Sequence, residues 1–151
     1  MRIEECGKNN YSIFLTKEFC CGRDIEDKDE LISFIKDFIL KFKNKLNMRG
    51  FYKVRVFPQE RVGIFLDVVK IDDIDLTNNL DLRIIVMNDS DIFFGTEYYE
   101  IIKDSNEKRY LDGLFYCIVD DSFDQILEKV EWGRFIYGKD VINLLTKGLI
   151  L

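Results

Sequence analysis

The sequence predicts an α+β fold in which a mostly antiparallel sheet is covered by one long amphipathic helix, with short helices near the C-terminus. Three observations support this prediction. Apolar residues recur at intervals of three and four over residues 27–47, as on one face of a helix. Apolar residues that alternate with polar ones follow, as in half-buried strands. Clusters of Asp, Asn and Gly separate these runs and indicate turns.

The long helix is expected to begin at about Asp27 or Asp29 and to end at about Asn47. Acidic residues lie near its start and lysines near its end, an arrangement that the helix dipole stabilises. Gly50 can take a positive φ just beyond the last turn. The apolar stripe expected to face the sheet consists of Leu31, Phe34, Ile35, Phe38, Ile39, Phe42 and Leu46.

The other elements follow from alternation and turn signals. Hairpins are expected at residues 1–6 with 11–16 and, beneath the helix, at 52–56 with 61–71. The second half should contain antiparallel strands at 80–87 and 92–103, a hairpin around Asp112-Gly113, a strand at 132–137, and helices at 122–130 and 139–147. The apolar end at 149–151 is expected to be buried, or to be a contact site if it is exposed.

The 151 residues are expected to form a single domain, with a candidate subdomain break near 72–79. The charge changes sign there: Lys and Arg outnumber Asp and Glu by 14 to 11 up to Ile71, and are outnumbered by 17 to 8 from Asp72 onward. This acidity argues against nucleic acid as a partner, because phosphate neutralisation needs clustered positive charge. One basic cluster, at 41–61, is explained by a helix C-terminus and a solvated strand face, or by docking of an acidic partner.

No apolar run reaches the roughly 18 residues of a membrane span, and the first residues show no apolar signal segment. The sequence therefore predicts a cytoplasmic protein without a membrane partner. It carries no signal for an oligomeric state.

The chain has no histidine, so the Ser-His-Asp triad, the Cys-His pair and the commonest general base are excluded. Neither common glycine-rich phosphate-binding motif occurs. Residues 73–84 lack the glycine and the final glutamate of an EF-hand calcium loop, and the acid pairs at 72–73 and 120–121 occupy predicted turns and caps. The cysteines, without metal-binding spacing, are Cys6, Cys20, Cys21 and Cys117. We therefore expect no catalytic residue, no cofactor, no metal site and no enzymatic activity.

Aromatic residues make up 14% of the chain, and most of them, Tyr98 included, fall on predicted strands where they pack in cross-strand pairs. Trp132, Arg134 and Tyr137 differ, because they lie beside glycines near the C-terminus and belong to residue types enriched in interface hot spots. They form the candidate protein-binding patch.

A family resemblance is carried by short segments. In the N-terminal part these are Met1–Glu4, Tyr11–Thr16, the helix that follows and Val54–Pro58; in the C-terminal part they are Tyr110–Tyr116, Glu131–Gly133 and Lys147–Ile150. The first set resembles the N-terminal region of MecA-type adaptor proteins, and the second is similar to parts of that family's C-terminal domain. The resemblance implies a non-enzymatic adaptor that delivers substrates to a Clp-type ATPase through its C-terminal region. The chain departs from the family in its shorter length, its missing linker, and the predicted strands at 80–103, where the family has a helix.

Our leading hypothesis is a cytoplasmic protein-interaction module, an adaptor or regulator that binds another protein. Two alternatives stay open. An inhibitor or immunity-type protein would use its acidic second half to cap a basic partner. A small carboxylate-based enzyme would need several acids converging in one concave pocket.

Overall fold

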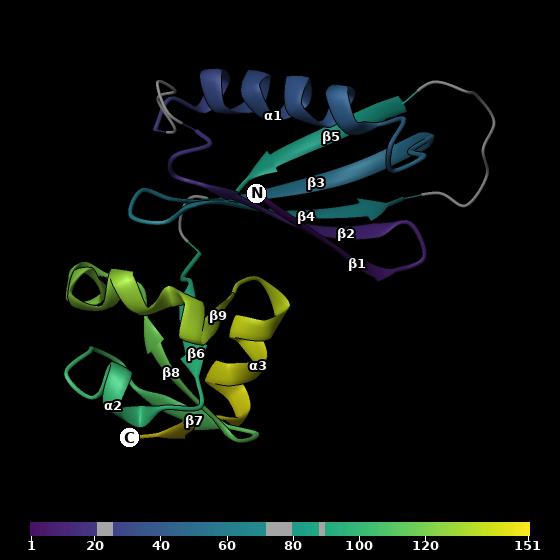
Figure 1. The fold of residues 1–151 in the computed structure, drawn as a ribbon. Helices are drawn as coiled ribbons and strands as arrows, with labels where there is room; N and C mark the ends of the chain where they lie inside the picture. The colour runs from purple at the N-terminus through teal and green to yellow at the C-terminus, as the bar shows by residue number, and fades with distance from the viewer. Residues whose placement is uncertain (21–25, 72–79, 88–89) are drawn as a thin grey trace. The chain divides into compact units, whose positions relative to one another are not determined.

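The computed structural model describes residues 1–20, 26–71, 80–87 and 90–151 (Figure 1). The chain divides into two compact units, Met1–Asn88 and Asp89–Leu151, and each is described by itself. The candidate subdomain break at 72–79 lies outside the described residues, and the single-domain expectation stays a prediction. Of the helices described, none combines the length and the apolar character needed to cross a membrane.

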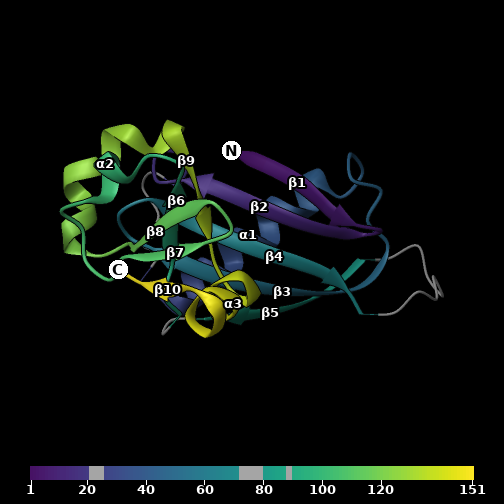
Figure 2. The ribbon, with the colours of Figure 1, turned by 90° about the horizontal axis from the view of Figure 1, so that it is seen from below.

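The N-terminal unit is a helix on a sheet. Its elements are β1 (Arg2–Gly7), β2 (Asn10–Thr16), α1 (Lys28–Phe42), β3 (Gly50–Gln59), β4 (Gly63–Lys70) and β5 (Leu80–Val86). In the described part of this unit, five strands lie in the order β1-β2-β4-β3-β5, which Figure 2 shows across the sheet. The predicted hairpins are confirmed, because β1 pairs antiparallel with β2 and β3 pairs antiparallel with β4.

Helix α1 is shorter than the sequence predicts. Asp27 is its N-cap, and its carboxylate accepts hydrogen bonds from the main-chain N–H groups of Asp29 at 3.0 Å and Glu30 at 3.2 Å. The helix ends at Phe42 instead of near Asn47. The intervening residues form turns, and Asn47 has a φ of 51°, a left-handed value that a right-handed helix does not contain.

The apolar stripe of α1 is buried against one face of this sheet. Four of its residues are at most 4% exposed: Leu31, Ile35, Phe38 and Ile39. They share a core with alternate residues of the central strands, including Leu15, Val54, Val56, Leu66 and Val68. Burying each such side chain contributes roughly 1.5–3 kcal/mol to folding, so this core holds the unit together.

Strand β5 does not pair as predicted. It was expected to lie antiparallel to the strand that follows it in the sequence, but it pairs parallel with β3, with Gly50 opposite Leu80 and Val56 opposite Val86. This position lets Leu82 and Ile84 pack against the core beneath α1. Burial of that alternating face therefore outweighs pairing with the nearest strand.

The C-terminal unit has its own sheet, with helices on both faces. Its elements are β6 (Phe93–Thr96), α2 (Tyr99–Ile102), β7 (Arg109–Leu111), β8 (Leu114–Ile118), the 3₁₀ helix η1 (Asp121–Trp132), β9 (Gly133–Ile136), α3 (Lys139–Lys147) and β10 (Leu149–Ile150). The described strands are all antiparallel to their neighbours, in the order β10-β7-β8-β6-β9.

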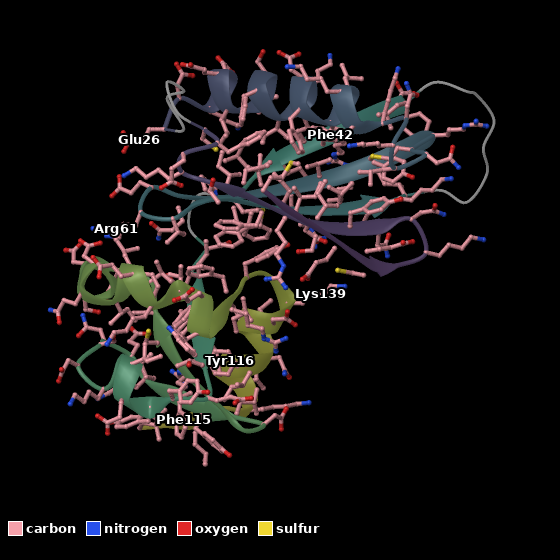
Figure 3. The ribbon with its side chains drawn as sticks, viewed as in Figure 1. Glu26, Phe42, Arg61, Phe115, Tyr116 and Lys139 are labelled. Atoms are coloured by element: carbon pink, nitrogen blue, oxygen red, sulfur yellow. The ribbon has the colours of Figure 1, made fainter. Side chains whose placement is uncertain are left out.

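Side-chain alternation divides the apolar residues of this unit between the two faces. On one face, Tyr116 packs with residues of β9 and α3, namely Ile136, Val141 and Leu144. On the other face, Phe94 contacts Phe123 of η1, with ring centroids 5.4 Å apart. Figure 3 labels Phe115 and Tyr116, neighbours on β8; Phe115 contacts Tyr99 and Tyr110. The sheet is therefore enclosed between α3 and the pair of α2 and η1.

Several local predictions for this unit are confirmed. Asp112 and Gly113 have φ values of 49° and 85°, as a two-residue hairpin turn requires, and they join β7 to β8. Helix α3 has the predicted bounds, and the N–H of Gly148 donates to the carbonyl of Leu144 at 2.8 Å beyond its end. The helix expected at 122–130 is instead the longer η1, whose N-cap is Asp120.

The strand expected at 92–103 is interrupted. Strand β6 ends at Thr96, whose hydroxyl oxygen accepts a hydrogen bond from the N–H of Tyr98 at 3.2 Å. Such a local bond turns the chain away from the sheet. Helix α2 then buries Ile102 completely. A helical turn therefore buries an apolar residue that alternation alone assigned to a strand.

The predicted architecture, one mostly antiparallel sheet covered by one long helix, is therefore wrong. The described residues form two mostly antiparallel sheets with short helices, and α1 packs on the sheet of its own unit. The C-terminal strands are covered by helices of their own unit, because α3 buries one face of their sheet and η1 packs on the other. Periodicity indicates which residues are buried, but it does not indicate which element buries them.

Candidate protein-binding surface

Two exposed aromatic side chains of the C-terminal unit contact each other. Trp132, the last residue of η1, and Tyr98, just before α2, are 55% and 51% exposed. Their ring centroids are 6.1 Å apart and their planes meet at 84°, an edge-to-face arrangement. Such a geometry is attractive because the positive edge of one ring meets the negative face of the other. We call these two residues the aromatic pair.

A buried threonine fixes the main chain under the aromatic pair. Thr96 is 1% exposed, and its hydroxyl donates a hydrogen bond to the carbonyl of Trp132 at 2.8 Å. The same hydroxyl oxygen accepts from the N–H of Tyr98 at 3.2 Å. The side chain of Thr96 therefore links the main chain at Tyr98 to the main chain at Trp132, 34 residues further along the sequence.

The other predicted site residues have different surroundings. Arg134 lies in the edge strand β9, is exposed, and stands opposite Gly95 of β6. Alternation places it on the face that carries Ile136 and α3. Tyr137 follows β9 at the turn into α3 and is half-buried. Of the predicted patch, Trp132 is thus the residue that the structure places in contact with another exposed aromatic ring.

Tyr98 was missed by the sequence analysis as a site residue, because it lay within an apparent strand where an aromatic side chain is expected to pack. The available signal was the interruption of that run by Gly95 and Thr96, a glycine and a residue that bonds to nearby main chain. The spatial proximity of Tyr98 to Trp132 has no local sequence signal, since it depends on the pairing of β6 with β9.

The chain around the aromatic pair is acidic. Glu97 and Glu131 immediately precede Tyr98 and Trp132, and both are exposed. Over residues 89–151 the sequence has 13 acidic and 7 basic residues, a difference of −6, whereas residues 1–88 have 15 of each. The entire net charge of the protein therefore belongs to the unit that carries the aromatic pair.

The C-terminal apolar residues are exposed, so the expectation that they are buried is wrong. Leu149, Ile150 and Leu151 are 66%, 77% and 52% exposed. On the neighbouring helix α3, Val141 and Leu144 face the core while Ile142 and Leu145 are exposed. Strand pairing holds the tail, with Leu149 opposite Tyr110 of β7. The edge of a sheet can form main-chain hydrogen bonds with a strand whose side chains are exposed.

Two groups that the sequence offers for chemistry, the Cys117 thiol and the Asp120 carboxylate, have structural surroundings. Burial raises the pKa of the Cys117 thiol to about 11, so this thiol is protonated near neutral pH. The carboxylate of Asp120 accepts from the N–H of Ser122 at 2.9 Å and from the side-chain amide of Asn106 at 3.0 Å, which caps η1. Within the described ranges, no three His, Cys, Asp or Glu residues are grouped to hold a metal ion. The acid pair at 72–73 lies outside those ranges.

Comparisons with protein-family models, with curated proteins and with solved structures find no match to this chain. The resemblance to MecA-type adaptors therefore stays a prediction, and the aromatic pair of the C-terminal unit is what points to a function.

Proposed function

We propose that this chain is a cytoplasmic, non-enzymatic protein-interaction module that binds a partner protein through the aromatic pair, Tyr98 and Trp132. The observation that carries this proposal is the exposure of two contacting aromatic rings whose main chains are tied together by the buried Thr96. Tryptophan and tyrosine dominate hot spots of protein interfaces. A preorganised pair loses little conformational entropy on binding, which favours affinity.

The charge around the pair supports a basic partner. Rings of Trp and Tyr attract cations at their faces, and the exposed Glu97 and Glu131 add negative charge beside them in the chain. A partner segment that presents Arg or Lys fits this surface. The net −6 of residues 89–151 would also increase the rate of encounter with a basic partner.

The same charge favours the second candidate, an inhibitor or immunity-type protein that caps a basic partner. The two functions differ in consequence, since an inhibitor blocks the activity of what it binds, whereas an adaptor leaves that activity intact. An activity assay of the captured partner, with and without saturating amounts of this protein, separates them.

The test of the proposed function is affinity capture with the intact chain and two variants. Trp132→Ala removes half of the aromatic pair; Phe51→Ala is the matched control, because Phe51 is also 55% exposed but belongs to the N-terminal unit. We expect a bound protein that the control retains and that Trp132→Ala binds roughly 30-fold more weakly, as for a hot-spot residue. Retention should also fall as salt is raised.

Two results would count against the proposal. In one, Trp132→Ala and Tyr98→Ala bind the captured protein as tightly as the intact chain. In the other, Phe51→Ala is the variant that loses the partner, which would move the contact to the N-terminal unit.

A further inference from the structure

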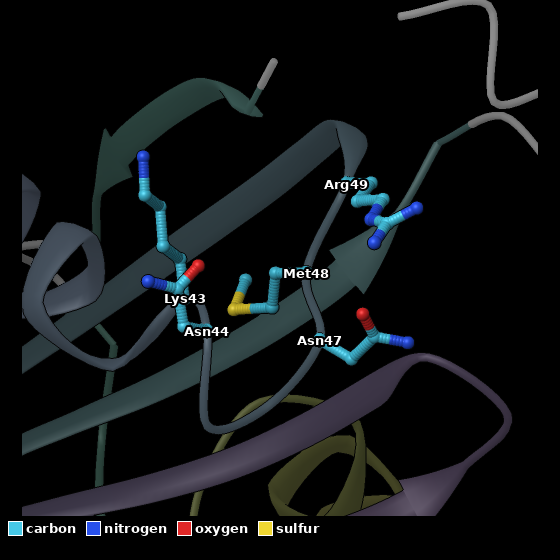
Figure 4. Close-up of a pocket in the computed structure, with 5 residues that line it drawn as sticks. All are labelled: Lys43, Asn44, Asn47, Met48 and Arg49. Atoms are coloured by element: carbon cyan, nitrogen blue, oxygen red, sulfur yellow. The ribbon is translucent and has the colours of Figure 1, made fainter. Parts of the chain in front are cut away.

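A pocket of about 450 Å³ opens in the N-terminal unit, between the end of α1 and the start of β3 (Figure 4). Its lining residues are Lys43, Asn44, Asn47, Met48 and Arg49. The close-up shows Met48 between Lys43 and Asn44 on one side and Asn47 and Arg49 on the other. Met48 is 4% exposed and forms part of the hydrophobic core, so the pocket stands on a packed base.

The chemistry of the lining suits an anion. Lys43 and Arg49 are cations, and the amides of Asn44 and Asn47 can donate hydrogen bonds. The residues known to line the pocket include no carboxylate. Ion pairs of the described N-terminal residues include those of Arg2, Arg55 and Arg61, and none of these three involves Lys43 or Arg49.

A helix C-terminus repels anions when its last carbonyl groups are free, but the carbonyls of Phe42 and Lys43 at the end of α1 are occupied. The carbonyl of Lys43 accepts from the N–H of Met48 at 2.9 Å, and that of Phe42 accepts from Leu46 at 3.1 Å. The carbonyl of Leu46 accepts from the hydroxyl of Tyr11 at 3.0 Å. These bonds both reduce the local negative potential and hold the loop that carries the lining residues.

We propose that this pocket binds a phosphorylated polar small molecule of the size of a sugar phosphate. Arg49 contacts the phosphate through its guanidinium fork, Lys43 adds a point charge, and Asn44 and Asn47 donate hydrogen bonds. The volume lies within the range of small-molecule sites, about 300–1,000 Å³, and exceeds what an inorganic ion needs. A polar body is favoured because Met48 is the one apolar residue in the described lining. This site is independent of the aromatic pair.

The experiment is an NMR titration of the ¹⁵N-labelled full chain with glucose 6-phosphate, inorganic phosphate, glucose and sodium chloride, at matched ionic strength. We expect saturable shifts of the main-chain N–H signals of residues 43–50 with glucose 6-phosphate, and weaker binding of inorganic phosphate. Arg49→Gln and Lys43→Gln should each weaken binding roughly tenfold, as for loss of one charged hydrogen bond. Arg49→Lys keeps the charge but loses the fork, and should give an intermediate affinity.

Lys41→Gln is the matched control, because Lys41 is exposed at the same helix end, carries the same charge and does not line the pocket. It should bind glucose 6-phosphate as the intact chain does. Equal losses in Lys41→Gln and Lys43→Gln would overturn the proposal by reducing it to diffuse electrostatics. Amide shifts with glucose 6-phosphate that are no larger than those in sodium chloride would also overturn it. Equal affinities for inorganic phosphate and glucose 6-phosphate would overturn it too, because they would mean an adventitious ion only. Unchanged amide spectra outside 41–50 verify that each variant is folded.

Discussion

The buried hydroxyl of Thr96 donates a 2.8 Å hydrogen bond to the main-chain carbonyl of Trp132, at the ends of the paired strands β6 and β9. Thr96 stands opposite Gly133 in this pairing, and its hydrogen bond reaches Trp132, the residue that precedes Gly133. This bond is partly buried, and a carbonyl left unsatisfied by the loss of its donor costs about 1–3 kcal/mol. The main chain of both residues of the exposed aromatic pair is therefore hydrogen-bonded to Thr96, which is 1% exposed.

Replacing Thr96 by Val tests the role of these hydrogen bonds, because valine keeps the shape of threonine and removes the hydroxyl. We expect the free energy of unfolding to fall by about 1–3 kcal/mol. Trp132 is the only tryptophan in the sequence, so its fluorescence reports both urea unfolding and access of iodide to the ring, and quenching should increase. Thr146→Val is the control: the hydroxyl of Thr146 bonds to Ile142 at 2.7 Å on an exposed part of α3. A change there equal to that of Thr96→Val would contradict the prediction.

Gly133 marks a close approach of two strands. Its φ of −165° is available to any residue, but a Cβ at this position would collide with the carbonyl oxygen of Gly95 and with the ring of Phe94. Gly133→Ala should therefore lower the free energy of unfolding by about 1–3 kcal/mol through overpacking, measured in urea. It should also disturb the Trp132 signal, since that residue is its neighbour.

The control for this substitution is Gly113→Asn at the tip of the hairpin. No atom lies within 4 Å of a Cβ placed on Gly113, and asparagine tolerates the left-handed conformation better than other side chains. Its cost should stay under about 1 kcal/mol. Equal costs at the two glycines would show that the contact with Gly95 does not decide the effect of Gly133→Ala.

Cys117 predicts a dependence of stability on alkaline pH. Burial is the main cause that raises its pKa from 9.0 to about 11; Asp120 raises it further, and a hydrogen bond with Ser105 acts in the opposite direction. The unfolded thiol ionises first as pH rises, so stability is complete below pH 9 and is lost as the pH rises to about 11. Urea unfolding across this window should give a steeper fall for the intact chain than for Cys117→Ala.

The thiol should also be unreactive in the folded protein. At pH 8, iodoacetamide should modify the exposed Cys6 readily and Cys117 only after unfolding, because the reagent attacks an accessible thiolate. Mass spectrometry of peptides from native and urea-treated protein makes this comparison. Parallel slopes for the intact chain and Cys117→Ala, or rapid native labelling of Cys117, would be inconsistent with a buried protonated thiol.

Local signals in the sequence were sufficient for several elements. The Asp112-Gly113 dipeptide predicted its hairpin because few residues adopt positive φ at two successive positions. The apolar spacing of α3, followed by Gly148, predicted that helix with its bounds. The start of α1 was also readable, since the carboxylate of Asp27 accepts bonds from the N–H groups that a helix leaves free.

The candidate site was readable only in part. Trp132 could be singled out by residue type and by its place beside glycines, but its contact with Tyr98 could not. The pocket at the end of α1 was visible only as an excess of basic residues. The loop that lines it contains Asn47, whose φ of 51° is left-handed, and Leu46, whose carbonyl accepts a hydrogen bond from Tyr11 of another element.

The sequence by itself determined the elements whose causes are local: caps, turns, the apolar stripe of α1 and the acidity of the second half. Only the tertiary structure decided that β5 joins β3 in parallel, that the later strands form a second sheet, and that Thr96 places Tyr98 beside Trp132. The physical reason is that periodicity and capping depend on a few neighbouring residues, whereas strand pairing and core burial depend on residues from the whole chain. A strand pairs where the most apolar surface becomes buried, and the distance between the paired strands along the sequence has little influence.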